Sequence, residues 1–177
     1  MIAWSHISDP MHVPLRSGNA LPQLHWIESH PLQYLGVVAK TMRMEGPTLV
    51  WSSIGILGHL DTKLSPVFVG AYLLMILWAA LNDPAGMNLR AGERMLAAAA
   101  VLISAALIFT LEYLVWDRVG VPFIEGIQGR YFVPLGLLSL LVLHRNGKYR
   151  ISASFMQIAI VISCLYAATA VILRFYV

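Results

Sequence analysis

Arg130 lies in the stretch of this chain whose residue types best suit chemistry, Gly126-Ile127-Gln128-Gly129-Arg130-Tyr131-Phe132-Val133-Pro134. Glycines let backbone amides approach a ligand closely, the start of a helix exposes unpaired N–H groups, and arginine adds a two-pronged donor. Pro134 suits the first turn of a following helix, where its missing N–H costs nothing. The pattern favours an anion site, and at a membrane surface the anion would be a lipid phosphate or pyrophosphate. The alternative is that Arg130 only anchors a helix among headgroups while Gln128 caps it.

A second candidate is Gly55-Ile56-Leu57-Gly58-His59-Leu60-Asp61-Thr62. Asp61 or His59 would act as a base or share a divalent cation. Two ligands do not define a metal site, because catalytic sites hold three or more protein groups, so no metal-ligand set is assigned. The alternative is that Asp61 caps a helix that enters near Ser65-Pro66.

Glu112 falls inside an apolar stretch, where a charged carboxylate costs a few kcal/mol. It should therefore face protein or water, paired with Arg118 or Arg130 or neutralised by a proton. The sequence contains no phosphate loop, no dinucleotide fingerprint, no Gly-x-Ser-x-Gly elbow and no His-Glu-x-x-His pattern.

The composition determines what kind of protein must position these residues. Of the 177 residues, 58% are hydrophobic and 12% charged, and the mean hydropathy is +0.70. A soluble domain would carry about twice that share of charge, so the chain is predicted to be an integral membrane protein. The 12 basic residues form no dense run against the 9 acidic ones, which excludes nucleic-acid binding as an interpretation. A single cysteine, Cys164, permits no intrachain disulfide.

The predicted fold is all-α, a polytopic bundle over residues 64–177. A bilayer core about 30 Å thick needs about 20 apolar residues in a helix. Apolar stretches predict four spans, and the third becomes long enough only if Arg130 and Tyr131 lie at one interface and the residues after Leu143 snorkel at the other. The spans are 64–81, 95–116, 130–145 and 155–176.

Basic residues set the predicted orientation. The loop 144–150 holds Arg145, Lys148 and Arg150 without an acid, so it is expected in the cytoplasm. The residues before 64 and the loop 117–130 are then extracytoplasmic in the inner (cytoplasmic) membrane. Both candidate motifs therefore share one face.

Residues 1–63 form the predicted extracytoplasmic segment, with an amphipathic helix over 32–44 that Gly46-Pro47 ends. This helix either packs on the protein or lies in the headgroup layer. The sequence shows no signal-peptide pattern. We therefore expect the C-terminal part of a larger polytopic protein, in preference to a chain whose first span carries about 60 residues across.

The string Ile54-Gly55-x-Leu57-Gly58-x-Leu60-Asp61-Thr62-x-Leu64, followed by Gly126 to Pro134, resembles a bacterial family. The run His30-Pro-Leu-Gln-Tyr-Leu35 and Thr41 resemble it too. The resemblance covers roughly residues 25–143 and points to the C-terminal half of the membrane proteins catalogued as domain of unknown function 2142 (DUF2142). That family is usually grouped with GT-C glycosyltransferases, which use polyprenyl-phosphate-linked sugars on the extracytoplasmic side.

The resemblance implies the C-terminal portion of a GT-C-like glycosyltransferase for cell-envelope polysaccharide. Arg130, with Gln128 and the Gly129 backbone, would hold the lipid-linked phosphate, while Asp61 would be the catalytic candidate, positioning an acceptor or supporting a divalent cation. The remaining substrate-binding candidates are Tyr131, His59 and Glu125.

The chain also departs from the GT-C pattern. The acid of the first outer loop has no counterpart beyond Asp9, and His59 stands where an aromatic residue is expected. Whether the chain is an enzyme therefore stays open. The alternatives are a non-catalytic membrane subunit, a flippase-like protein that binds lipid carriers, or an inactive fragment that needs its N-terminal half or other envelope-biosynthesis proteins.

Overall fold

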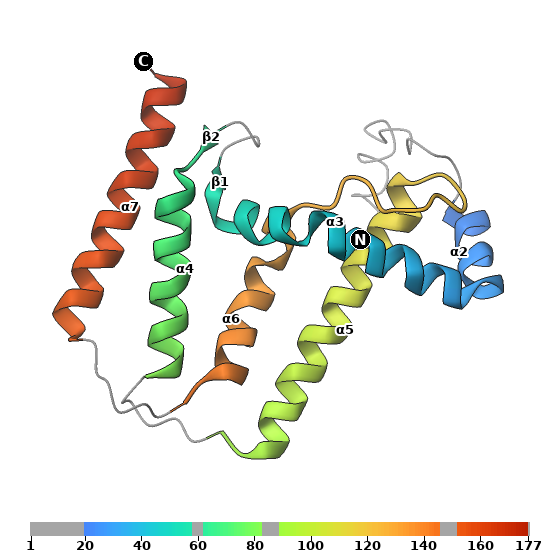
Figure 1. Ribbon diagram of the computed structural model, residues 1–177, viewed down its shortest axis with the longest axis horizontal. Helices are drawn as coiled ribbons and strands as arrows, with labels where there is room; N and C mark the ends of the chain where they lie inside the picture. Colours follow the sequence, from blue (N-terminus) through green and yellow to red (C-terminus); the bar gives the residue numbers. More distant parts are fainter. Residues whose placement is uncertain (1–19, 58–61, 83–88, 146–151, 177) are drawn as a thin grey trace, which may run out of the picture. The chain divides into compact units, whose positions relative to one another are not determined.

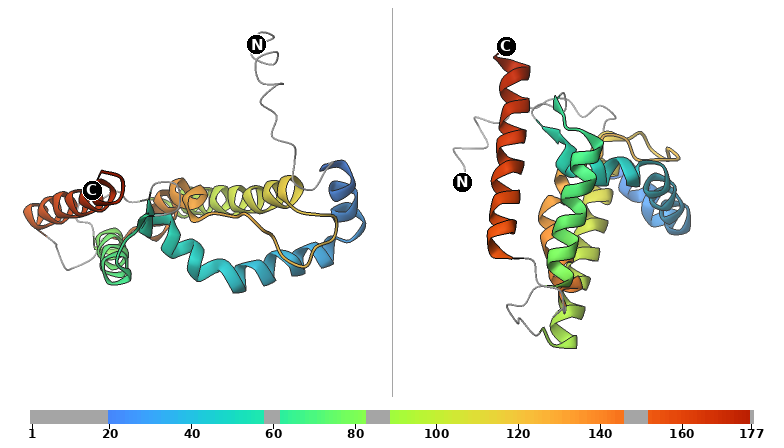
Figure 2. Two further views of the ribbon diagram at one scale, coloured as in Figure 1. Left: turned by 90° about the horizontal axis from the view of Figure 1, so that it is seen from above. Right: turned by 60° about the vertical axis from the view of Figure 1, so that its left-hand side comes forward.

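The computed structural model describes residues 20–57, 62–82, 89–145 and 152–176. They are mostly helical, as predicted, with one short antiparallel hairpin in which Ile56 lies opposite Lys63 and Leu57 opposite Thr62. Figures 1 and 2 show the elements in chain order: α2 (Ala20–Ser29), α3 (Pro31–Gly55), β1 (Ile56–Leu57), β2 (Thr62–Lys63), α4 (Pro66–Leu81), α5 (Ala91–Trp116), η2 (Gly129–Phe132), α6 (Val133–Leu143) and α7 (Ala153–Phe175).

The chain divides into two compact units. The first contains Met1–Met44 and Ile108–Ile127, and the second contains Glu45–Leu107 and Gln128–Val177. Both α3 and α5 therefore contribute to each unit.

The first unit is built around the end of α5. Tyr113 is fully buried there, and the loop that follows it is held by side chains. The Gln23 side chain donates to the Tyr113 carbonyl oxygen and accepts from Gly120 N–H, both at 3.2 Å, and Thr41 Oγ1 accepts from Ile124 N–H at 2.9 Å. Because these buried polar groups are paired, an irregular loop can be part of the core. Gly120, at φ +74°, adopts a left-handed conformation that glycine accommodates without strain.

The second unit contains the hairpin, α4, η2, α6 and α7. Helix α4 begins at Pro66, directly after Ser65, where the proline lacks only an N–H that would be unpaired in any case. Helices α4 and α6 lie side by side, and Arg145 N–H donates to the Ala80 carbonyl at 3.0 Å. At the C-terminal end of α6, the carbonyl oxygens of Val142 and His144 also accept hydrogen bonds from the Arg94 guanidinium of α5.

Two helices are long and apolar enough to cross a bilayer, Ala91–Trp116 and Ser154–Phe175, each with a hydropathy of 2.2. Only 6% of the apolar window of the first and none of that of the second is buried within the protein. A core helix of a soluble protein would be mostly buried, so these exposed apolar surfaces favour contact with lipid. The other two predicted spans correspond to shorter apolar helices, Pro66–Leu81 and Gly129–Leu143.

One sequence prediction about a helix end is wrong. The helix predicted to stop at Gly46-Pro47 continues to Gly55, with Pro47 inside it. Tertiary contacts of the turns beyond Pro47 outweigh its cost, because Leu49 is buried and the following serines contact Gly129. The helix predicted to enter near Ser65-Pro66 does begin at Pro66, and Asp61, its candidate cap, lies outside the described residues.

Candidate functional site

Gly129 lets the candidate motif pack directly against three residues of α3, Leu49, Ser52 and Ser53, which together we call the Gly129 seat. A Cβ at this position would lie well inside van der Waals contact of the Leu49 carbonyl oxygen, the Ser52 hydroxyl and the Ser53 backbone nitrogen. The glycine is buried, and the 3₁₀ turn that contains it begins with the Tyr131 N–H bond to the Gln128 carbonyl, 3.1 Å. The turn joins α6 where Val133 N–H donates to the Arg130 carbonyl. Close packing against α3 therefore explains the glycine without any ligand.

Arg130 projects from this seat. Its side chain is exposed, and its Cζ lies 5.8 Å from the centroid of the Tyr131 ring, within cation–π distance. The described acids of this unit are Glu45 and Glu93, and neither forms an ion pair with Arg130. Since the guanidinium is always charged, its counterion has to come from elsewhere.

Gln128 and Trp51 carry polar atoms without partners. Among the described residues, Gln128 Oε1 and Trp51 Nε1 are buried and make no hydrogen bond. Trp51 lies on α3, and a Cβ on Gly55 would fall 2.9 Å from its Nε1 and from Val69 Cγ2. Buried unpaired atoms cost free energy, so each is a position where a ligand or water would be stabilising.

In the first unit, Asp117 follows α5 directly and is 4% exposed. Both of its carboxylate oxygens accept from the Glu125 N–H at 3.2 Å. Burial raises the pKa of Asp117 to about 6, the Glu125 N–H lowers it, and the negative charge of Glu125 raises it further. Glu125 itself is exposed.

Glu112 lies one turn earlier on α5. Its Oε2 is buried without a hydrogen bond, and within the described part of this unit it forms no ion pair with Arg118. Gly126, with φ +76°, packs over it, because a Cβ there would lie 3.6 Å from Glu112 Oε2. Of the two surroundings that the sequence allowed for this carboxyl, protein or water, protein surrounds its Oε2. Of the partners considered, Arg118 does not form an ion pair with it among the described residues of this unit.

Comparison with models of protein families gives a match over residues 1–139 to the family described as Predicted membrane protein (DUF2142). The chain belongs to the DUF2142 family. No curated protein and no solved structure matches it. As a DUF2142 member it is a membrane protein, in agreement with the exposed apolar faces of its helices.

In this DUF2142 protein the predicted site residues fall into three groups. Gln128, Gly129, Arg130 and Tyr131 are together in and beside η2. Glu125 belongs to the other compact unit, and Asp61 and His59 lie outside the described residues. Within the described part of the chain, no group of three or more His, Cys, Asp or Glu side chains is arranged to hold a metal ion.

The seat formed by Leu49, Ser52 and Ser53 was not anticipated from the sequence, nor was the buried Asp117. The seat residues follow Gly46-Pro47 in the chain. Because this pair predicted the end of the helix, no pattern in the sequence indicated the further helical turns that contain Leu49, Ser52 and Ser53. Asp117 follows Trp116 directly, and an acid directly after an apolar span usually suggests only a solvated loop. Its burial depends on the fold of the loop that covers it.

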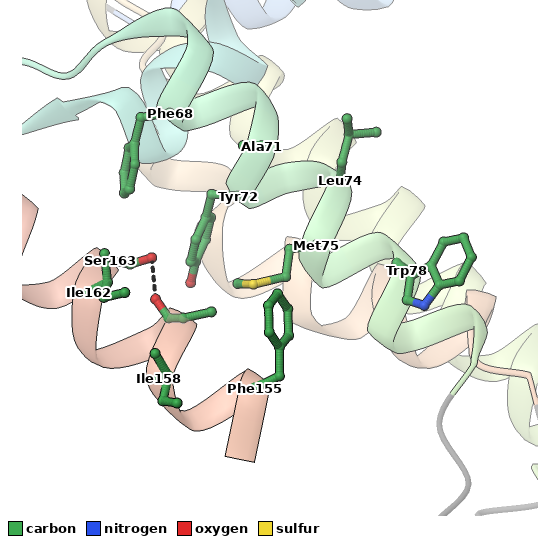
Figure 3. Close-up of a pocket in the computed structure, with 11 residues that line it drawn as sticks. Phe68, Ala71, Tyr72, Leu74, Met75, Trp78, Phe155, Ile158, Ile162 and Ser163 are labelled. Carbon is green, nitrogen blue, oxygen red and sulfur yellow. Dashed lines mark hydrogen bonds between the residues drawn. The ribbon is translucent and has the colours of Figure 1, made fainter. Parts of the chain in front are cut away.

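An apolar groove of about 690 Å³ lies between α4 and α7 in the second unit (Figure 3). Phe68, Tyr72 and Met75 of α4 point toward α7, which contributes Phe155 and Ile158 among others. The hydroxyl of Ser163 on this wall donates to the Ala159 carbonyl at 2.7 Å, so it needs no further partner. At one end the two helices meet, where the rings of Phe68 and Tyr166 are 4.5 Å apart.

Proposed function

We propose that this DUF2142 protein binds the phosphorylated headgroup of a polyprenyl-linked sugar at Arg130, as the C-terminal portion of a GT-C-like membrane glycosyltransferase for bacterial cell-envelope polysaccharide. The observation that carries the proposal is the exposed guanidinium of Arg130, which forms no ion pair with either described acid of its unit. An arginine fork matches a phosphate bidentately, and its affinity for anions rises where water is scarce.

The seat of Gly129 on α3 supports a binding role, because it fixes the backbone from which Arg130 projects. A preorganised donor loses less entropy on binding than a mobile one. The buried Oε1 of Gln128, next in the chain, is an acceptor without a donor and would suit a ligand hydroxyl. A sugar phosphate offers both an anion and hydroxyl groups.

The groove between α4 and α7 supports a long-chain lipid in preference to a soluble sugar nucleotide. Its lining is almost entirely carbon, and its serine hydroxyl is already paired. A hydrocarbon chain is the ligand that such a lining suits.

In this proposal four spans cross the inner membrane, at 64–81, 95–116, 130–145 and 155–176, and the residues before 64 and the loop 117–130 face outward. Asp61 would lie on the same outer face as Arg130 and position the acceptor, with or without a divalent cation.

The second candidate function is lipid-carrier binding without chemistry, as a membrane subunit or flippase-like protein. It is favoured by the observation that, among the described residues of the second unit, no carboxylate forms an ion pair with Arg130. Sugar transfer by the purified protein, with and without added divalent cation, distinguishes the two functions.

The test of the proposal is the substitution Arg130→Ala, with Arg118→Ala as the matched control. Arg118 is also exposed, and it precedes the motif. Loss of a charge-assisted bidentate contact should weaken binding of a photoreactive polyprenyl-phosphate sugar by about tenfold to a hundredfold. The measurement is crosslinking yield against lipid concentration in nanodiscs.

Folded yield and thermal unfolding are measured on the same samples. Arg118→Ala should leave the crosslinking curve unchanged. If Arg130→Ala reduces folded yield as much as it reduces crosslinking, or if both alanine variants weaken crosslinking equally, the arginine is structural and the proposal is wrong.

A further inference from the structure

The first half of α3, residues 31–44, presents three different surfaces. Successive residues on a helix are about 100° apart, so positions three or four apart share a side. Tyr34, Val37 and Thr41 share one side, and Val37 and Thr41 are buried while Tyr34 is half-buried. This side packs on the rest of the first unit.

A second side of the same helix is apolar and exposed. Leu32, Leu35 and Met42 are 82%, 60% and 56% exposed, and Ala39 shares their side. A contiguous exposed apolar surface is unfavourable in water and marks a contact with lipid or protein.

The third side is polar and basic. Gln33, Lys40 and Arg43 lie there, all exposed, and residues 31–44 contain no acid. Two cations beside an apolar surface complement the phosphates and acyl chains of a lipid leaflet, since the cations reach the headgroups while the apolar side chains enter the hydrocarbon.

The contacts of α3 place it near the depth where such a layer lies. The Tyr34 hydroxyl hydrogen-bonds Thr110 Oγ1 of α5 at 2.7 Å, and the rings of Tyr34 and Tyr113 are 5.6 Å apart. Thr110 lies about 9 Å along the helix axis from Trp116, the last residue of the span, at a rise of about 1.5 Å per residue. Interfacial helices insert to about 5–10 Å, so α3 meets α5 at the boundary between headgroups and acyl chains.

Within this unit α3 runs across α5 and not along it (Figure 1). A helix that crosses a membrane span near the end of that span runs along the membrane surface. We propose that residues 31–44 lie in the headgroup layer of the bilayer, with Leu32, Leu35 and Met42 in the acyl region and Lys40 and Arg43 at the lipid phosphates. The proposal concerns the first unit alone and is independent of ligand binding at Arg130.

Spin-label accessibility tests this placement in the full chain reconstituted into phosphatidylglycerol vesicles. Single cysteines replace Leu35 or, as the matched control on the opposite side, Gln33, in a Cys164→Ser background. The label at 35 should collide several-fold more with oxygen, which partitions into lipid, and several-fold less with a water-soluble nickel chelate. The label at 33 should show the reverse preference.

A label at 35 that is accessible to the nickel chelate would place this side in water and overturn the proposal. One shielded from both reagents would mean that protein, a second copy or another segment, covers it, and would also overturn the proposal. In the double variant Lys40→Glu, Arg43→Glu, the label at 35 should become more accessible to nickel in phosphatidylglycerol than in phosphatidylcholine vesicles. An equal response in both lipids would overturn the role of the two cations.

Discussion

Gly129 is a glycine because α3 leaves no room for a side chain. The sequence predicted that this glycine lets a ligand approach the backbone, whereas the structure shows α3 itself in that space. The sequence correctly predicted that another group lies close to the backbone at this glycine. No local pattern indicates whether that group belongs to a ligand or to the protein itself. The exposure of Arg130 beside it was predictable, since a charged residue at a span end is rarely buried.

Gly129→Ala should destabilise the second unit. The added methyl group meets two backbone atoms that cannot move independently, and overpacking of this kind costs about 1–3 kcal/mol. Thermal unfolding in detergent measures the loss. Gly136→Ala on α6 is the control, because no atom lies within 4 Å of its added Cβ, and there alanine should be neutral or stabilising. Equal effects of the two substitutions would refute the packing role of Gly129.

Asp117 should make stability depend on pH. Its pKa, raised by burial to about 6 in the folded protein, lies above the ordinary value of 3.8, so the folded state holds the proton more tightly than the unfolded state. The resulting stabilisation is complete below about pH 4 and is lost as the pH rises through about 6. The free energy of unfolding should therefore fall over this window and level off above it.

Asp117→Asn tests this assignment, because the amide keeps an oxygen for the Glu125 N–H and carries no charge. The variant should match the parent at about pH 4, exceed its melting temperature at about pH 7.5 and show a shallower slope between. Glu28→Gln, at a 66% exposed side chain, should leave the slope as it is. A slope that survives Asp117→Asn unchanged would assign the titration to another group.

Arg94 connects helices α5 and α6 by hydrogen bonds. Its guanidinium donates to the carbonyl oxygens of Val142 at 3.1 Å and His144 at 2.7 Å, at the end of α6. A cation at a helix C-terminus pairs orphan carbonyls and complements the dipole. Such a contact between distant segments could not be predicted from charge position alone.

Arg94→Gln should therefore loosen the end of α6. Loss of two charge-assisted hydrogen bonds at half-buried carbonyls should cost about 1–3 kcal/mol, measured as a lower melting temperature and faster amide exchange over 141–145. Arg90→Gln is the control, because the Arg90 side chain is exposed and the hydrogen bond from Arg90 to Glu93 Oε2 is donated by the backbone N–H, which the substitution keeps. Faster exchange in both variants would point to a charge effect on the loop in place of a specific cap.

Taken as a whole, the chain has a small core and a large apolar exterior. Seven hydrophobic residues of the described part are buried, whereas the exposed large hydrophobics extend along α4, α5, α6 and α7. The composition predicted that apolar side chains would lie on the outside, because a chain with few charged residues cannot form a surface suited to water. Helix existence was also predictable from apolar length. The hairpin and the division into two units were not, because two-residue strands leave no periodic signal and the unit boundary depends on tertiary contacts.

Pro47 lies three residues after Met44, where the chain passes from the first unit to the second. Because proline has no amide hydrogen, the carbonyl of Arg43 lacks its donor from the next helical turn. The backbone hydrogen bonding of α3 is therefore weakest at Pro47. A bend of α3 therefore costs least beside Pro47, within a few residues of the point where the chain passes from one unit to the other.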